Sequence, residues 1–387
     1  MRERLAQRNS EISSFHVMEL LRRAKELEAQ GKDVIHLEIG EPDFPTPQAV
    51  INAGIAHLKT GHVKYTPAAG LPELRHKIAA FYQTYYKVTI DWQQIFITPG
   101  ASGAFLLAFG TSLNPNEELL ISDPCYPCNN NFAALFGAKC KNIPVNADSR
   151  FQLNANLIKS HWNSNTKGAL IASPSNPTGT LISAEELEQA IKTVNSLGGC
   201  FFSDEIYHGL VYDQTATTAL AFSDNVFVIN SFSKYFGMTG WRIGWLIVPD
   251  EFIEATEKLA QNIYIATSTQ SQYAALASFD IDTLTELEFR RTEFAARRDF
   301  LYDALIKLGF EINIKPEGAF YIYANCEKFT HNSYQFAVDF LESEAVAITP
   351  GIDFGHHKAH LMLRFAYTTS IDKLTIAIQR LKRFINQ

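Results

Sequence analysis

The residues best suited to chemistry follow apolar, strand-like segments in the middle of the chain. Asp204 and Tyr207 come after the segment CFFS, and Ser231, Ser233 and Lys234 come after VFVIN. Open α/β sheets bind ligands at the carboxyl ends of their strands. A carboxylate and a lysine buried there cost free energy unless each holds a partner. The pattern therefore predicts either a ligand site or a buried ion pair between Asp204 and Lys234.

A glycine-containing turn at residues 99–103 indicates an anion site near these residues. The turn lies between the strand-like segment FIT and an apolar helix, so backbone N–H groups at the helix start are free to bind an anion. Ser231, Ser233 and Arg242 add hydroxyl and guanidinium donors that suit a phosphate.

Several common catalytic motifs are absent from the sequence. It contains no G-x-G-x-x-G at the start of a helix, no G-x-x-x-x-G-K-[ST], no G-x-S-x-G and no H-E-x-x-H. An NAD-binding Rossmann fold, a P-loop, a serine hydrolase and a zinc protease are therefore disfavoured. Cys125 and Cys128 are the only close cysteines, and no second pair or nearby histidine completes a metal site. We expect no metal and interpret these cysteines as structural.

The elements that must position these residues follow an α/β pattern. Short apolar segments alternate with helical ones, as in a largely parallel sheet with crossover helices. A capping box at Ser183 and Glu186 begins one such helix. The predicted strands are residues 94–98, 118–122, 139–145, 168–173, 199–203, 226–231 and 242–248.

A second, smaller α+β domain is predicted from the two ends of the chain. Apolar residues at helical spacing predict a helix over residues 17–30, and a long charged helix is expected over 284–308. Shorter strands are expected at 319–323, 345–349 and 360–366. We predict a large domain over residues 46–280 and a small domain formed by 1–45 with 281–387.

Composition narrows the class of protein further. The chain has 387 residues, enough for two or three domains, and its net charge of -7 is the wrong sign for binding nucleic acid. Membrane spans need roughly 18–20 apolar residues, and the longest candidate, 100–113, is broken by Gly, Ser and Thr. The charged, polar N-terminus does not resemble a secretory signal, so a cytoplasmic location is expected.

The segment SFSKYFGMTGWRIG at residues 231–244 resembles the pyridoxal-phosphate attachment signature of class I aminotransferases. Other landmarks of that family are matched in the same order by GEPDFPTP, KYTPAAGLPELR, SPSNPTG, SDEIYHGLVYD and LRFAYTTS. The resemblance covers nearly the whole chain. It implies a fold-type-I enzyme of the class I/II family, with a mostly parallel seven-stranded sheet and pyridoxal phosphate as cofactor.

The resemblance also implies roles for single residues. Lys234 would bind the cofactor covalently and then move a proton, Asp204 would face the pyridine nitrogen, and Tyr207 would bond the ring oxygen as a third catalytic residue. Tyr126 would stack on the ring. The implied cofactor-binding residues are Ala101, Ser102, Tyr126, Asn176, Asp204, Tyr207, Ser231, Ser233, Lys234, Arg242 and, from a neighbouring subunit, Tyr65.

Substrate binding is implied at a further set of residues. Arg364 stands where the family keeps the arginine that binds the substrate carboxylate. Gly40, Asn176 and Phe15 are expected near the substrate, and Phe15 with Tyr264 would line an apolar or aromatic pocket. Some relatives hold a second carboxylate with a lysine where this chain has Ser102. The resemblance therefore does not imply that the amino donor has an acidic side chain.

The function implied is transfer of the α-amino group of an L-amino acid to a 2-oxo acid, with 2-oxoglutarate expected, by a ping-pong mechanism in a homodimer whose active sites share Tyr65. A C–S lyase that uses the same site for β-elimination is the alternative. A third hypothesis is the ligand-sensing domain of a transcription regulator. Such regulators carry a basic DNA-binding module, which the acidic charge of this chain disfavours.

Overall fold

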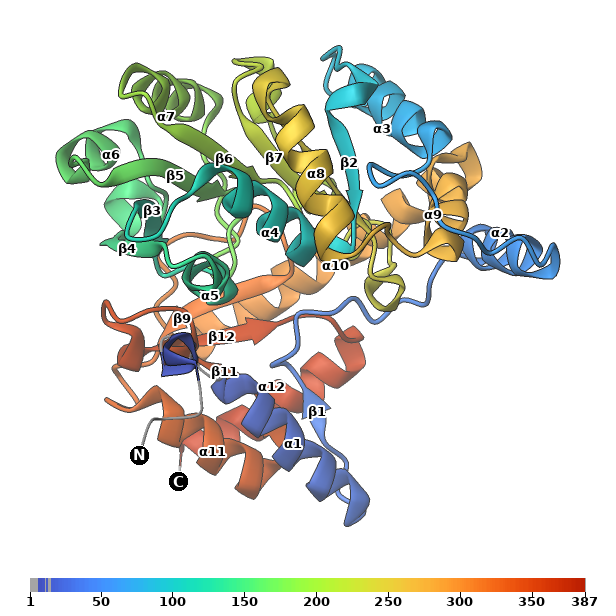
Figure 1. Cartoon of the computed structure of the whole chain (residues 1–387). Coiled ribbons are helices and arrows are strands. Elements are labelled where there is room, and N and C mark those ends of the chain that lie inside the picture. Colours follow the sequence, from blue (N-terminus) through green and yellow to red (C-terminus); the bar gives the residue numbers. More distant parts are fainter. Residues whose placement is uncertain (1–5, 11, 13–14, 387) are drawn as a thin grey trace, which may run out of the picture.

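A seven-stranded sheet forms the centre of the computed structural model, which describes residues 6–10, 12 and 15–386 (Figure 1). The strand order is β2-β8-β7-β6-β5-β3-β4. Only β8 runs antiparallel to its neighbours. The strands are β2 (Ile95–Thr98), β3 (Glu118–Asp123), β4 (Lys139–Pro144), β5 (Thr166–Ala172), β6 (Cys200–Asp204), β7 (Phe227–Ser231) and β8 (Gly244–Ile247). The predicted fold class and all seven predicted strands are confirmed.

Helices cover both faces of this sheet, because its central strands are apolar on both sides. In β6, Phe201 packs into the core beneath α3, α6 and α7, whereas Phe202 packs into the core beneath α4, α5 and α8. Ser183 caps α7 as predicted, accepting the Glu186 N–H at 3.2 Å. The helices are α3 (Pro72–Tyr85), α4 (Gly100–Ser112), α5 (Cys128–Leu135), α6 (Ala155–His161), α7 (Ala184–Ser196) and α8 (Ile253–Ile263).

The two ends of the chain meet in a second layer of structure, in the lower half of Figure 1. It holds the helices α1 (His16–Ala29), α11 (Ser333–Glu344) and α12 (Ile371–Ile385). Strands β9 (Tyr321–Asn325), β11 (Thr349–Pro350) and β12 (Met362–Ala366) form an antiparallel sheet. Strand β1 (Ile35–His36) pairs in parallel with β10 (Val346–Ala347). The domain boundaries near residues 46 and 281 remain a prediction.

Two predicted strands differ in detail from the structure. The segment 345–349 is divided, because Val346–Ala347 pairs with β1 whereas Thr349–Pro350 pairs with β12. The segment 319–323 begins later than expected, since Ala319 has a φ of 58° and leaves extended geometry. Its strand, β9, starts at Tyr321.

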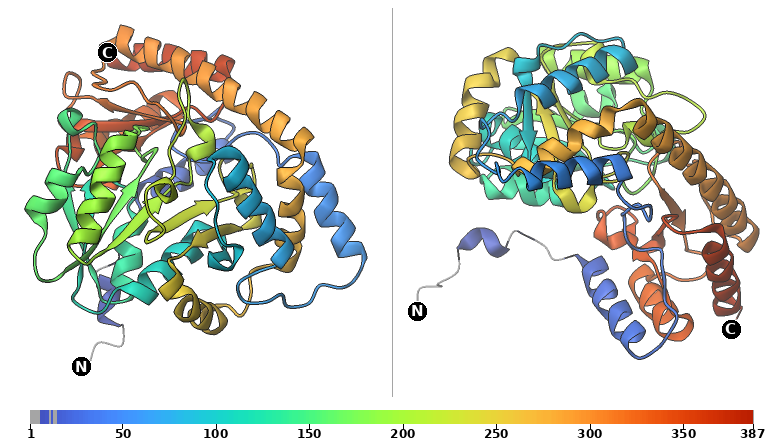
Figure 2. Two further views of the ribbon diagram at one scale, coloured as in Figure 1. Left: turned by 90° about the horizontal axis from the view of Figure 1, so that it is seen from above. Right: turned by 90° about the vertical axis from the view of Figure 1, so that its right-hand side faces the viewer.

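A long helix contacts both parts of the structure. Helix α10 (Ile281–Leu308) contacts both α12 and β9, and Figure 2 shows it running from the region of α2 toward α12. Helices α2 (Gln48–Lys59) and α9 (Thr269–Leu276) pack together at one edge. Among the described helices, none is long and apolar enough to cross a membrane.

Candidate active site

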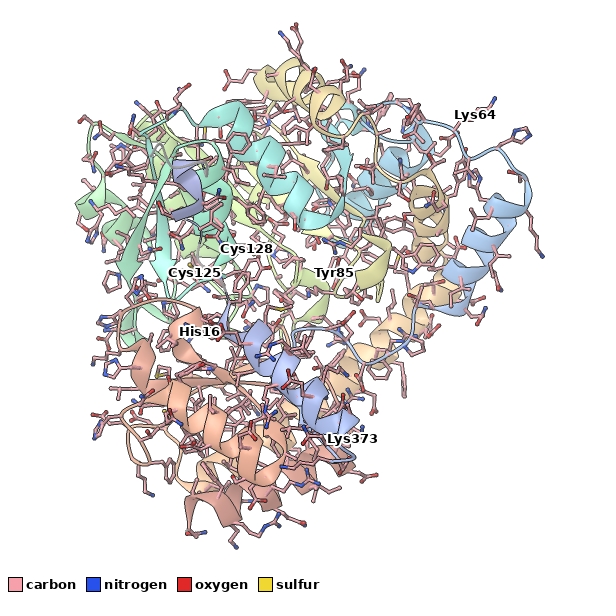
Figure 3. The ribbon with its side chains drawn as sticks, turned by 60° about the horizontal axis from the view of Figure 1, so that its bottom comes forward. His16, Lys64, Tyr85, Cys125, Cys128 and Lys373 are labelled. Carbon is pink, nitrogen blue, oxygen red and sulfur yellow. The ribbon has the colours of Figure 1, made fainter. Side chains whose placement is uncertain are left out.

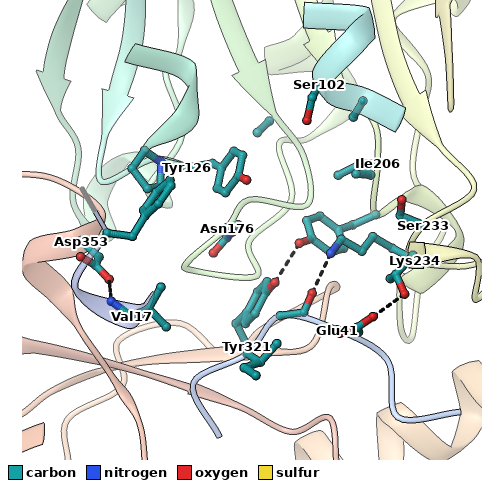
Figure 4. Close-up of a pocket in the computed structure, with 18 of the residues that line it drawn as sticks. Val17, Glu41, Ser102, Tyr126, Asn176, Ile206, Ser233, Lys234, Tyr321 and Asp353 are labelled. Atoms are coloured by element: carbon teal, nitrogen blue, oxygen red, sulfur yellow. Dashed lines mark hydrogen bonds between the residues drawn. The ribbon is translucent and has the colours of Figure 1, made fainter. Parts of the chain in front are cut away.

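A cavity of about 740 Å³ opens at the carboxyl ends of the central strands, with α1 and β12 on its other side (Figure 4). It brings together residues that are up to 349 positions apart, Phe15 and Arg364. The predicted site residues that line it are Phe15, Gly40, Ala101, Ser102, Tyr126, Asn176, Asp204, Tyr207, Ser233, Lys234, Arg242 and Arg364.

Lys234 follows β7 and points its amine into the cavity. Its Nζ donates a hydrogen bond to the Gly40 carbonyl at 2.6 Å. Burial lowers the pKa of Lys234 to about 8; Glu41 opposes the shift, and the cations Arg364 and Arg242 add to it. An amine with this pKa is partly neutral at physiological pH. It therefore suits covalent attachment of an aldehyde cofactor and proton transfer.

Asp204 ends β6 as a buried carboxylate, with 6% of its surface exposed. It accepts the Ile206 N–H at 3.2 Å, and no cationic side chain of the described residues forms a salt bridge with it. Burial raises the pKa of Asp204 to about 7. A buried carboxylate with so few partners fits the protonated ring nitrogen of pyridoxal phosphate.

The start of α4 forms a cradle that fits a phosphate. Pro99 precedes the helix without a side-chain cap, so its first N–H groups face the cavity. Gly100 has a φ of +69°, and a Cβ added there would lie 2.7 Å from the Arg242 guanidinium. Ser233 and Arg242 line the same end of the cavity. The left-handed backbone conformation of residue 100 favours a glycine there.

Ser231 lies behind this cradle rather than in the cavity wall. Its hydroxyl is 2.9 Å from the Ser233 hydroxyl and 3.1 Å from the Ile243 carbonyl, and it accepts the Ser233 N–H. Ser231 therefore orients Ser233, and its own contact with the cofactor remains a prediction.

Arg364 on β12 lies between two aromatic rings, 4.3 Å from the Tyr321 centroid and 4.7 Å from the Phe354 centroid. Its Nη1 donates to Asn176 Oδ1 at 3.0 Å, and its Nη2 donates to the Glu38 carbonyl at 2.5 Å. Its Nε has no hydrogen-bond partner among the described residues. This buried cation without a carboxylate partner fits a substrate carboxylate.

Tyr321 is a further residue of the site that was not predicted from the sequence. It bonds Tyr207 and lies against Gly40. The Tyr207 and Tyr321 hydroxyls are 2.9 Å apart, and burial raises the pKa of Tyr207 well above its ordinary value. A Cβ added to Gly40 would lie 1.9 Å from the Tyr321 hydroxyl. No local sequence pattern marks Tyr321, which reaches the site because it lies diagonally across from Arg364 on the strand paired with β12.

Other expected residues lie outside this cavity. Tyr65 is 80% exposed at the edge of the molecule, which leaves its role in a neighbouring subunit a prediction. Tyr264 packs against the apolar core beside α4 and α8, so the expectation that it lines the pocket is wrong for its own chain. Cys125 and Cys128, labelled in Figure 3, are both free thiols.

Comparison with known proteins assigns the chain to a family. The model of "Aminotransferase class I and II" matches residues 32–381. The chain is 40% identical to the (5-formylfuran-3-yl)methyl phosphate transaminase of Methanocaldococcus jannaschii, over 99% of this chain and 100% of that protein. It is 34% identical to the aspartate aminotransferase of Thermotoga maritima, over 99% of each chain.

A solved structure agrees with these relatives. An aminotransferase from Mycobacterium tuberculosis superposes with a TM-score of 0.95 at 35% identity, with 99% of each chain covered. The lysine, carboxylate and phosphate cradle described above fit the cofactor of this family. The chain therefore belongs to the class I and II aminotransferases and is a transaminase that depends on pyridoxal phosphate.

Proposed function

We propose that the chain transfers the α-amino group of an L-amino acid to a 2-oxo acid, with 2-oxoglutarate as an acceptor, by a ping-pong mechanism. The observation that carries this proposal is Arg364, a buried guanidinium with an unpartnered Nε in the same cavity as the Lys234 amine. A planar guanidinium matches the carboxylate that amino acids and 2-oxo acids share. Fixing that group orients the bonds of the neighbouring Cα.

The residues around the cofactor have distinct proposed roles. Pyridoxal phosphate supplies an electron-withdrawing ring that stabilises negative charge at the substrate Cα. Lys234 Nζ accepts the proton that leaves the Cα, and the Gly40 carbonyl orients this amine. Asp204 would supply negative charge to the ring nitrogen, and Asn176 and Tyr207 would supply hydrogen-bond donors to the ring oxygen.

A ping-pong order follows from the shared carboxylate site. The amino acid and the 2-oxo acid each have a carboxylate that needs a guanidinium at the same place. Among the described residues that line the cavity, Arg364 is the arginine whose side chain is buried. Two substrates that compete for one group bind in turn. The first product would therefore leave Arg364 before the second substrate binds there, which is a ping-pong order.

We also propose that the protein acts as a homodimer in which Tyr65 reaches the phosphate site of the neighbouring subunit. Apolar side chains near Tyr65 are exposed, among them Leu58 at 52%, Val63 at 45% and Ile265 at 53%. The Lys64 carbonyl accepts a hydrogen bond from Thr269 at 2.6 Å, which holds this segment beside α9. Exposed apolar surface of this kind is typical of a protein interface.

Mixing two inactive variants tests the shared site. Lys234→Ala removes the amine from one subunit, and Tyr65→Ala removes the phosphate contact that the other subunit donates. A mixed dimer then contains one intact site, made from Lys234 of one subunit and Tyr65 of its partner. We expect mixing to restore activity. If Tyr65 acts within its own subunit, no intact site forms and the mixture stays inactive.

A cytoplasmic location is part of the same proposal. All five cysteines are free thiols, as expected in a reducing compartment.

The central experiment follows cofactor absorbance while the purified enzyme meets single amino acids. We expect one class of L-amino acid to convert the cofactor to its amino form, and a 2-oxo acid to reverse the change. Adding 2-oxoglutarate and pyruvate separately identifies the acceptor. If the spectrum recovers without a 2-oxo acid while ammonia and pyruvate accumulate from cystathionine, the enzyme is a C–S lyase and the proposal is refuted.

A further inference from the structure

The first turns of α1 form an apolar wall of the cavity. Val17, Met18 and Leu21 line it from this helix, and Phe15 lines it from the position just before the helix. In Figure 4, Val17 lies at the opposite end of the cavity from Lys234. Phe354, whose ring packs on Arg364, lines the cavity as well. A substrate with its carboxylate on Arg364 and its Cα near Lys234 must direct its side chain into the remaining space, beside this wall.

One carboxylate, that of Asp353, fixes the position of the wall. Asp353 Oδ1 accepts the His16 N–H at 2.8 Å, and Oδ2 accepts the Val17 N–H at 2.7 Å. Asp353 is 7% exposed and lines the cavity itself. Its partners lie 337 and 336 positions earlier in the chain. Both oxygens are therefore committed to the start of α1.

The helix depends on this contact because its own sequence supplies no cap. The residue before α1 is Phe15, whose side chain accepts no hydrogen bond. The first N–H groups of a helix need acceptors, and negative charge is favourable there. Asp353 satisfies two of these groups from the short helix Gly351–Asp353, which lies between β11 and β12. The contact ties the apolar wall to the sheet that carries Arg364.

We propose that Asp353 is a positioning residue that holds α1 as the specificity wall of the cavity, and that the amino donor has a large apolar side chain. This inference rests on the proposed function. The wall offers apolar side chains to the part of the substrate that Arg364 and Lys234 do not contact. A donor such as L-phenylalanine or L-leucine gains free energy by burial against it, whereas L-alanine is too short to reach it.

The test measures the donor half-reaction alone, so it does not depend on the acceptor. Asp353→Asn keeps the shape of the side chain, but its amide nitrogen cannot accept the second N–H. We expect kcat/KM for L-phenylalanine and L-leucine to fall by about ten-fold, chiefly through KM, and that for L-alanine to change by less than about two-fold. Asp353→Glu, which retains both acceptors, is expected to restore part of the loss.

Two further variants separate positioning from stability. Met18→Ala shortens the wall at a side chain that is 57% exposed, so it leaves the core intact, and it is expected to reproduce the selective loss. Asp339→Asn is the matched control: this exposed carboxylate on α11 bonds Gln335, and no donor should be affected. An equal loss for alanine and phenylalanine in Asp353→Asn, or no loss for either, overturns the inference. If no amino acid changes the cofactor spectrum of the parent enzyme, the proposed function itself fails.

Discussion

Replacing Asp204 with asparagine should change the stability of the cofactor-free protein in a pH-dependent way. The carboxyl ionises near its ordinary pKa of 3.8 in the unfolded chain, whereas burial raises the pKa to about 7 in the folded one. Between these values the folded state binds more protons than the unfolded state. Stability is therefore lost as pH rises from about 4 to about 7, and it is constant above that range.

The size of this loss of stability follows from the shift in the pKa of Asp204. One pKa unit corresponds to roughly 1.4 kcal/mol, so Asp204 costs the cofactor-free protein up to about 4 kcal/mol at pH 8, where it is ionised in both states, and up to about 2 kcal/mol at pH 5.5, where only the unfolded chain ionises. Asparagine carries no such cost. The stability of Asp204→Asn relative to the parent should therefore be about 2 kcal/mol more favourable at pH 8 than at pH 5.5. Comparing two pH values cancels the constant cost of burying an amide.

Urea unfolding of the cofactor-free proteins at the two pH values measures this difference. Glu205, another buried carboxyl whose pKa burial raises to about 7, is present in both proteins, so the burial part of its contribution cancels; the charge of Asp204, a smaller influence on its pKa than burial, is lost in the variant. Adding pyridoxal phosphate should stabilise the parent more than Asp204→Asn, since only the parent offers a carboxylate to the ring nitrogen, and turnover of the variant should fall by orders of magnitude. The reasoning is refuted if the free energies of unfolding of the parent and Asp204→Asn differ by the same amount at both pH values. It is also refuted if the cofactor stabilises the two proteins equally.

Three further predictions concern the same cavity. The rate at which pyridoxal phosphate attaches to Lys234 should rise with pH through about 8. Glu41→Gln should move this profile to lower pH, because Glu41 raises the pKa of Lys234. A stopped-flow rate that is flat across this range contradicts the assignment of Lys234 as the attachment site. Gly40→Ala should cost about 1–3 kcal/mol in thermal unfolding and reduce kcat/KM, since its Cβ meets the Tyr321 hydroxyl. Adding Tyr321→Phe should recover part of the loss, and strictly additive losses would show that the contact is not the cause. Arg364→Lys, which lacks the planar fork, should raise KM for the amino donor by roughly 10–100-fold with unchanged cofactor absorbance, and an unchanged KM would remove Arg364 from substrate binding.

The central sheet could be predicted from sequence because its signals are local. Strands buried on both faces, such as β6 and β7, have continuous apolar runs. The residues directly after such runs must lie at one edge of a parallel sheet. That rule alone placed Asp204 and Lys234 near each other, and the family motifs supplied their partners.

The rest of the site depends on contacts between distant segments, which no local pattern reveals. Tyr321 reaches the cavity through the pairing of β9 with β12, and Asp353 reaches α1 across more than 330 positions. The division of residues 345–349 into two strands depends on which partner each half finds. The link between the two serine hydroxyls is likewise visible only in the structure, where Ser231 and Ser233 lie 2.9 Å apart.

The pairing of β1 with β10 has a consequence for biosynthesis. The strand partners of residues 35 and 36, residues 346 and 347, are synthesised 311 residues later. At about 5–20 residues per second, this interval lasts roughly 15–60 seconds. During that time the central sheet can already form, while the N-terminal segment has no strand to join. The substrate half of the active site is therefore completed after the cofactor half.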